Sequence, residues 1–220
     1  MKAAKFEYIL AESIEQVVQV LDQGDGEAIV IAGGQTLMPM LSMRLARPET
    51  VIDINKIAEL SGIEVTADEV IIKACTRQAE ALASPEIQTR LPLLAKAISY
   101  VGHQQTRNRG TVGGSLSHAD PASEIPLAAL AMDAHVSLRS AAGARRVAMA
   151  DYFLGPMMTA RADNEVLLAV HFPLPQGDVR VGTAFHEVSE RRGDFAVVAA
   201  AAHIQLDKDG ICSNAALAIG

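Results

Sequence analysis

Arg109-Gly-Thr-Val-Gly-Gly-Ser-Leu-Ser-His-Ala-Asp-Pro-Ala-Ser-Glu124 joins a glycine pair to small hydroxyl residues and ends on an acidic residue. A related stretch, Ile31-Ala-Gly-Gly-Gln-Thr-Leu37, lies about 80 positions earlier. Glycine lacks a Cβ, so successive backbone amides can face one concavity and bind an anion such as a pyrophosphate. Two such loops predict a diphosphate held between two segments of the chain. The plainer alternative is a pair of tight turns.

The first glycine pair lies at the end of a short apolar strand, Ala28 to Ile31, and a helix is expected over residues 37–45. Before it, Ser13 and Gln16 have the spacing of a capping box, which starts a helix that ends near Gly24. A second strand is expected over residues 50–54. These elements predict a small β-α-β unit near residues 1–60.

The second glycine loop belongs to a region that mixes helices and strands. A strand over 69–74 and helices over 76–82 and 92–101 precede the loop. Ser123 is expected to cap a helix that runs to about Met132, and strands follow over 134–139 and 166–172. Two prolines and a glycine between 173 and 178 indicate a linker, after which 183–188, 196–206 and 215–219 are expected as antiparallel strands.

Composition narrows the function classes. The formal net charge of −7 and the lack of any long basic block argue against nucleic acid as a partner. The longest apolar run without charged residues, 195–206, is shorter than the roughly 20 residues of a membrane span, and no signal peptide is recognised. Cys75 and Cys212 form no metal-binding pattern and are expected as reduced, buried thiols of a cytoplasmic protein. The glycine loops match neither a P-loop nor a Rossmann fingerprint.

Three motifs, in order along the chain, resemble those of the flavin-binding medium subunit of molybdenum hydroxylases, the carbon monoxide dehydrogenase and xanthine dehydrogenase group. The first is Ala32-Gly-Gly-Gln-Thr-Leu37 with Pro39, Arg44-Leu-Ala-Arg-Pro48 and Asp53-Ile-Asn55. The second is Arg107-Asn-Arg-Gly-Thr-Val-Gly-Gly-Ser115 with His118-Ala-Asp-Pro121 and Glu124, and the third is Arg191-Arg-Gly-Asp-Phe195. The resemblance covers essentially the whole chain.

The resemblance implies an α+β fold in which a PCMH-type FAD-binding domain of two α/β subdomains grips FAD. The domain would span residues 1–175, with subdomains at about 1–60 and 61–175. Residues 179–220 would be the N-terminal part of a small α+β C-terminal domain, which we expect to be incomplete in this sequence.

The resemblance also implies a set of FAD-binding residues. The two glycine loops would hold the pyrophosphate, Glu124 would bind the adenosine ribose, and Asp120 would order its loop. Leu167 or Leu168 would line the adenine or flavin-ring pocket. Glu187 stands where relatives carry Lys near the flavin ring, and Thr36 where the family often has Ser. The loop residues are Ala32, Gly33, Gly34, Gln35, Thr36, Thr111, Gly113, Gly114 and Ser115.

The function that the resemblance implies is electron transfer within a heteromeric molybdenum hydroxylase. A small partner chain would carry [2Fe-2S] clusters and a large one the molybdenum cofactor, in a dimer of heterotrimers. Electrons would pass through FAD to an external acceptor, so no catalytic acid–base pair and no metal site are expected on this chain. The alternatives are a stand-alone PCMH-type flavoprotein oxidase and a flavin-free assembly subunit.

Several polar residues keep two interpretations. His118 contacts the ligand or orders its loop. Arg107 and Arg109 neutralise the pyrophosphate or brace the loop against carboxylates. The Arg191-Arg192-Gly-Asp194 stretch lies near the open face of the flavin or forms a surface ion network.

Overall fold

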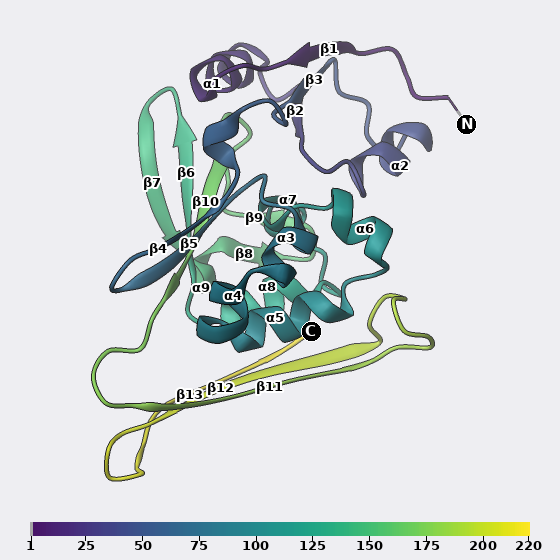
Figure 1. The fold of residues 1–220 in the computed structure, drawn as a ribbon. Helices are drawn as coiled ribbons and strands as arrows, with labels where there is room; N and C mark the ends of the chain where they lie inside the picture. The colour runs from purple at the N-terminus through teal and green to yellow at the C-terminus, as the bar shows by residue number, and fades with distance from the viewer. Residues whose placement is uncertain (1) are drawn as a thin grey trace.

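The computed structural model describes residues 2–220 as an α+β fold with three larger sheets and a two-stranded one. Figure 1 shows the N-terminal unit at one end of the molecule, a helical layer in the middle and the C-terminal sheet at the other end. Within the described residues, no helix is long and apolar enough to cross a membrane.

The N-terminal unit is a three-stranded parallel sheet with the order β1-β3-β2. Its elements are β1 (Glu7–Leu10), α1 (Ile14–Gln23), β2 (Ala28–Ile31), α2 (Leu37–Ser42) and β3 (Thr50–Asp53). Val17, Val18 and Leu21 form the buried face of α1, so the helical periodicity of the sequence matches the packing. The predicted β-α-β unit is confirmed, and β1 is an additional strand that the sequence analysis did not find.

The start of α1 confirms the predicted cap with one change in detail. The Gln16 amide donates to Ser13 Oγ at 3.2 Å, as expected. Gln16 Oε1, however, accepts from the amide of Glu12 at 2.9 Å. The helix ends at Gly24, whose amide donates to the Leu21 carbonyl.

The second region is built on a five-stranded antiparallel sheet with the order β4-β5-β10-β6-β7. Its strands are β4 (Ile63–Val65), β5 (Glu69–Lys73), β6 (His135–Ser140), β7 (Gly143–Ala148) and β10 (Val166–Pro173). The connections carry η1 (Ala58–Leu60), α3 (Gln78–Ala83), α4 (Pro85–Arg90), α5 (Pro92–Tyr100), α6 (Gln104–Arg109), α7 (Val112–His118), α8 (Glu124–Ala131), α9 (Met149–Tyr152) and the hairpin β8 (Phe153–Gly155) and β9 (Met158–Thr159).

The C-terminal sheet consists of β11 (Arg180–Val188), β12 (Val198–Leu206) and β13 (Cys212–Ile219), all antiparallel. One face packs on α5 and α8 (Figure 1), so these helices lie between two sheets. Phe185, Ala201 and Ala218 from this face belong to the main hydrophobic core. The three strands predicted after the linker are confirmed: β11 and β13 each begin three residues earlier than expected, and β12 begins two residues later.

The two cysteines differ in environment. Cys75 is buried in the core of the N-terminal unit, and burial raises the pKa of its thiol to about 11. Cys212 is exposed at the start of β13, so the expectation that both thiols are buried is wrong. The first four residues of β13 are all exposed, which the local sequence does not reveal.

Candidate functional site: a cleft lined by two glycine loops

The two glycine loops line one cleft of about 520 Å³, a volume typical of ligand sites. The cleft lies between the N-terminal unit and the second region, because β2 and α2 contribute one wall and α7 with the start of α8 contribute another. The predicted residues that line it are Ala32, Gly33, Gly34, Gln35, Thr36, Thr111, Gly113, Gly114, Ser115, Asp120 and Glu124.

The first loop presents unused backbone donors. Among residues 2–220, no acceptor is bonded to the amides from Gly33 to Leu37, while the next amide, that of Met38, donates to the Gly34 carbonyl. Gly34 has a φ of +71°, a conformation that favours glycine. The Gln35 and Thr36 side chains are exposed at the same place. This loop therefore has the free donors that an anion-binding nest requires.

The second loop is organised differently from the predicted nest. It forms the first turn of α7, and Thr111 Oγ1 accepts from the Gly114 amide at 3.0 Å. The amides of Val112 and Gly113 donate to Thr76 and Ala74, and that of Ser115 donates to the Thr111 carbonyl. The second loop therefore does not form the anion-binding nest that is one of its two interpretations, because these amides already have partners.

Two glycines are required by close approach. A Cβ on Gly33 would collide with the carbonyl of Arg109, so the first loop touches the residue that precedes the second loop. A Cβ on Gly113 would lie 2.6 Å from Ala74 Cα, which places α7 directly against the end of β5. Glycine here serves packing as well as access to the cleft.

Glu124 is one of the two buried acidic residues that line the cleft. It is the first residue of α8, is 7% exposed, and has a pKa of about 7. Burial is the main cause of the raised pKa, and the charges of Glu187 and Asp120 add to it. Asp120 orders the preceding loop, since its Oδ1 accepts from the Ala122 amide at 2.9 Å.

Two of the predicted residues lie elsewhere. Leu168 does not line the cleft, whereas Leu167 does. A β-bulge between Leu167 and Ala169 breaks the alternation of β10, and Leu168 packs against the core of the N-terminal unit. Glu187 also lies outside the cleft lining and is buried on the inner face of β11, where its Oε2 has no partner among the described residues.

Other segments contribute residues that the sequence analysis missed. Gln78 lines the cleft, is 6% exposed, and has an Oε1 without a hydrogen-bond partner in residues 2–220. Arg161 and Glu165 line it from the segment before β10, and Arg145 holds Glu165 in a two-pronged ion pair at 2.6 and 2.8 Å. These residues carry no motif, because separate parts of the chain bring them together.

Arg107, His118 and Asp194 have different surroundings in the structure. Arg107 Nη1 donates to the carbonyls of Val101 at 2.7 Å and Gly102 at 3.1 Å, so Arg107 braces its own loop through carbonyls. His118 lines the cleft, and its Nε2 lies 3.9 Å from Asp120 Oδ2, too far for a hydrogen bond. Asp194 lines the cleft with Gly193 and Phe195, whereas Arg191 and Arg192 do not.

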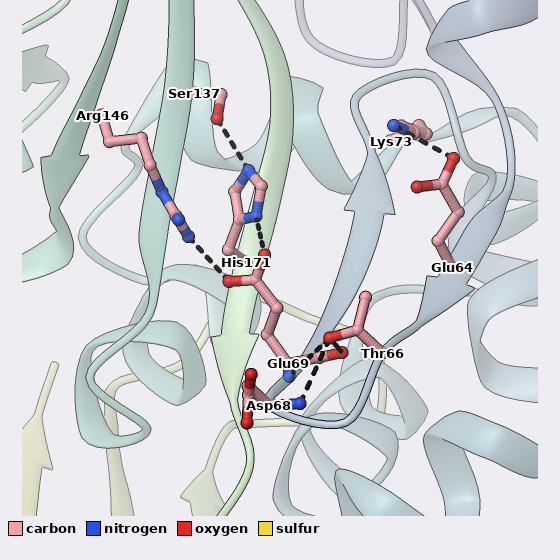
Figure 2. Close-up of polar contacts among 8 residues, drawn as sticks. All are labelled: Glu64, Thr66, Asp68, Glu69, Lys73, Ser137, Arg146 and His171. Atoms are coloured by element: carbon pink, nitrogen blue, oxygen red, sulfur yellow. Dashed lines mark hydrogen bonds and ion pairs between the residues drawn. The ribbon is translucent and has the colours of Figure 1, made fainter.

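A separate polar network lies on the five-stranded sheet, outside the cleft lining (Figure 2). Ser137 Oγ lies 2.7 Å from His171 Nε2, His171 Nδ1 lies 3.0 Å from Glu69 Oε1, and Arg146 donates to Glu69 Oε2 at 2.7 Å. The order Ser–His–Glu matches that of a nucleophilic triad. However, β6 is paired with a strand on each side, so its amides serve the sheet and provide no oxyanion hole. The network therefore acts as a cross-strand tie.

The donor set within residues 2–220 excludes a clustered metal site, because no group of three or more His, Cys, Asp or Glu side chains is placed to hold an ion. The cleft instead offers backbone amides, hydroxyls and the buried carboxyl groups of Glu124 and Glu165, of which Glu165 is already paired with Arg145. These groups fit a phosphate-containing organic ligand with ribose hydroxyls.

Comparison with known proteins gives a consistent family. Residues 4–175 match the family described as FAD binding domain in molybdopterin dehydrogenase. The chain is 39% identical, over all of its 220 residues and 73% of the relative, to the 6-hydroxypseudooxynicotine dehydrogenase complex subunit alpha of Paenarthrobacter nicotinovorans. It is 38% identical to the carbon monoxide dehydrogenase medium chain of Hydrogenophaga pseudoflava, over 90% of this chain and 68% of the relative.

Solved structures agree with these relatives. A carbon monoxide dehydrogenase structure from Hydrogenophaga pseudoflava superimposes with a TM-score of 0.94 at 36% identity, covering 100% of this chain and 75% of the other. Quinoline 2-oxidoreductase from Pseudomonas putida 86 superimposes with a TM-score of 0.92 at 36% identity and the same coverage.

Proposed function

Because this chain belongs to the family of FAD-binding medium subunits of molybdenum hydroxylases, we propose that its cleft holds one FAD and that the chain relays electrons to an external acceptor. The chain is the FAD subunit of a heteromeric molybdenum-containing dehydrogenase and thus part of an oxidoreductase. Bound FAD supplies the redox centre. The chain's own residues bind and orient the cofactor.

The observation that carries this proposal is the first glycine loop. Its unused amides from Gly33 to Leu37 face no protein acceptor in the described chain, and they line the cleft together with the Gln35 and Thr36 side chains. A pyrophosphate satisfies such donors and is stabilised by them. We assign the pyrophosphate to this loop.

The second loop supports the same ligand by other means. Thr111 and Ser115 line the cleft with their hydroxyl-bearing side chains, while Gly113 lets α7 pack against the end of β5. The buried Glu124 is the proposed acceptor for the ribose hydroxyls. Leu167 replaces Leu168 as the proposed apolar contact from β10, and Glu187 is removed from the FAD-binding set.

Membership of the family implies a multi-subunit assembly. The chain is a medium chain of a multi-subunit molybdenum hydroxylase complex. Beyond that, we propose a small partner with [2Fe-2S] clusters and a large partner with the molybdenum cofactor, arranged as a dimer of heterotrimers in the cytoplasm. We also propose residues 1–175 as the FAD-binding domain and 179–220 as part of a C-terminal domain.

A titration of the purified chain with FAD tests the cofactor assignment. Wild type is expected to bind about one FAD per chain, with flavin absorption bands that persist after gel filtration. Gln35→Glu keeps the size of the exposed side chain but adds a negative charge beside the proposed pyrophosphate. It should weaken FAD binding about 10-fold through charge repulsion.

The matched control is Gln19→Glu, which adds the same charge at an exposed position of α1 outside the cleft lining. It should leave the affinity unchanged. A folded wild-type chain without flavin would contradict the assignment and favour a flavin-free assembly role. Oxidase turnover of a small substrate by the isolated chain would favour a stand-alone flavoprotein.

A further inference from the structure

A continuous set of polar contacts joins the two glycine loops across the boundary between the N-terminal unit and the second region. Asn55 Nδ2 donates to the Ala32 carbonyl at 2.8 Å. Arg77 Nη2 donates to Asn55 Oδ1 at 2.6 Å, and Arg77 Nη1 donates to the Arg109 carbonyl at 2.5 Å. Two side chains therefore connect the residue before one glycine pair with the residue before Gly110-Thr111.

The contact with the Ala32 carbonyl determines the orientation of the first glycine loop. In a trans peptide the carbonyl and the following amide point in opposite directions. The contact from Asn55 holds the Ala32 carbonyl, and so turns the Gly33 amide away from the bridge. Gly33 is the first of the unused donors that line the cleft. The bridge therefore fixes the direction of the Gly33 amide, which is one of the groups proposed to bind the phosphate.

The bridge also fixes the separation of the loops. Gly33 already touches the Arg109 carbonyl, the same atom that Arg77 holds. A further contact ties Arg77 to the second loop, since Arg77 and Thr111 form an antiparallel β-bridge. Small changes at Arg77 would therefore move the first loop relative to Thr111.

The anchor of the bridge lies in the N-terminal unit. Asp53 Oδ1 accepts from the Asn55 amide at 2.8 Å and from Asn55 Nδ2 at 2.6 Å, and Asp53 Oδ2 accepts from Tyr8 Oη at 2.7 Å. Burial raises the pKa of Asp53, but these hydrogen bonds and the charge of Arg77 outweigh it and lower the pKa overall. A charged Asp53 orients Asn55 toward Ala32 and Arg77.

From this geometry we propose that Asn55 and Arg77 are positioning residues for FAD, and that they set the separation and direction of the two glycine loops. The inference rests on the proposed function for its ligand, but the bridge itself is a property of the chain. Neither side chain lines the cleft, so each acts through the loop that it holds.

The test compares Asn55→Ala, Arg77→Ala and the double variant in two measurements. The first is the dissociation constant for FAD, measured from the change in flavin fluorescence. Each single variant should raise it about 10-fold or more, and the double variant should raise it little further, because either change breaks the same bridge. The second is hydrogen exchange without FAD at the amides of Met38, Gln78 and Val112, which are hydrogen-bonded at the two loops and should exchange faster in all three variants.

Two further variants separate positioning from general stability. Arg77→Lys keeps the positive charge but lacks the fork that reaches both Asn55 and Arg109, so it should not restore FAD affinity. Arg146→Ala removes an arginine contact outside the cleft, the ion pair with Glu69, and should change neither measurement. Thermal unfolding of each variant shows whether it has remained folded.

Each outcome either supports or contradicts the positioning role of Asn55 and Arg77. Additive losses in the double variant, normal affinity in Arg77→Lys, or unchanged exchange at the amides of Met38, Gln78 and Val112 would overturn the bridge. Failure of the wild-type chain to bind FAD would instead contradict the proposed function, and the exchange measurement would still decide whether Asn55 and Arg77 order the loops.

Discussion

Glu124 shows how one residue joins the cleft to the rest of the fold. Its position at the start of α8 places the carboxyl group at a helix N-terminus, which favours the charged form. Burial and the neighbouring carboxylates of Glu187 and Asp120 favour the neutral form and dominate, so the pKa rises to about 7. The cleft therefore contains a carboxyl group that changes charge near neutral pH.

The raised pKa of Glu124 predicts a pH dependence of stability. The folded-state pKa of about 7 exceeds the ordinary value of 4.5, so the stabilising contribution is full below pH 4.5 and is lost as the pH rises through 7. Glu124→Gln should remove this loss and be more stable than wild type at pH 8, by on the order of 3 kcal/mol. Urea unfolding of the FAD-free chain between pH 5 and about pH 8 measures it.

The control for this prediction is Glu190→Gln at an exposed position, which should follow the wild-type pH profile. A Glu124→Gln variant whose stability relative to wild type is constant across the pH range would show that Glu124 stays charged in the folded chain.

At the scale of elements, α7 is held in place by close contact with β5. The Gly113 amide donates to the Ala74 carbonyl at 3.0 Å, and the missing side chain lets the two backbones meet. The glycine pair of this loop therefore has two separate duties, because Gly113 is buried and Gly114 is exposed.

Gly113→Ala should destabilise the chain by about 1–3 kcal/mol, since its Cβ would overlap the backbone of Ala74. The measurement is the free energy of unfolding in urea. Gly182→Ala serves as the control, because a Cβ at Gly182 meets nothing within 4 Å. If both variants were equally stable, the close contact of α7 with β5 would carry no energetic weight.

Local patterns predicted many elements and failed where long-range contacts decide the structure. The start of α1 follows from Ser13 and Gln16, and β2 follows from an apolar run between turn residues. The strand β1 was missed, since its residues are mostly exposed and only pairing with β3 makes them a strand. The second glycine loop has the composition of a nest but does not form one, because the carbonyls of Ala74 and Thr76 occupy its amides, and the sequence cannot show these contacts.

The candidate site was predictable to the same extent. The glycine motifs located two walls of the cleft, and their order along the chain identified the family. The sequence could not place Leu168, because a β-bulge reverses the expected alternation. It also could not find Gln78 or Arg161, which reach the cleft only through the folded arrangement.

At the scale of the whole molecule, the C-terminal sheet leaves one face uncovered in residues 2–220. Phe185 of β11 and Ala201 of β12 are paired and buried on the inner face. The residues next to them along each strand point outward, because side chains alternate between the two faces. The outward face is largely apolar and includes exposed Val188, Val198, Ile204, Leu217 and Ile219. Contiguous apolar surface of this kind favours association.

We expect the purified chain of residues 1–220 to self-associate through this face at micromolar concentrations. The double variant Ile204→Lys/Leu217→Lys places two charges on the face and should shift the chain toward monomer without loss of FAD binding. Sedimentation velocity measures the change. A wild-type chain that sediments as a monomer at these concentrations would sink the idea.

The contact of Gly33 with Arg109 has a consequence for the order of events during biosynthesis. The strands of the parallel N-terminal sheet are complete once residue 53 has been translated. The opposite wall of the cleft, however, needs residues up to 124, and Gly193 to Phe195 also line it. Domains fold from the N-terminus as the ribosome proceeds, and contacts this distant in sequence form late. We therefore expect FAD to load into this cleft only after residue 195 has been translated.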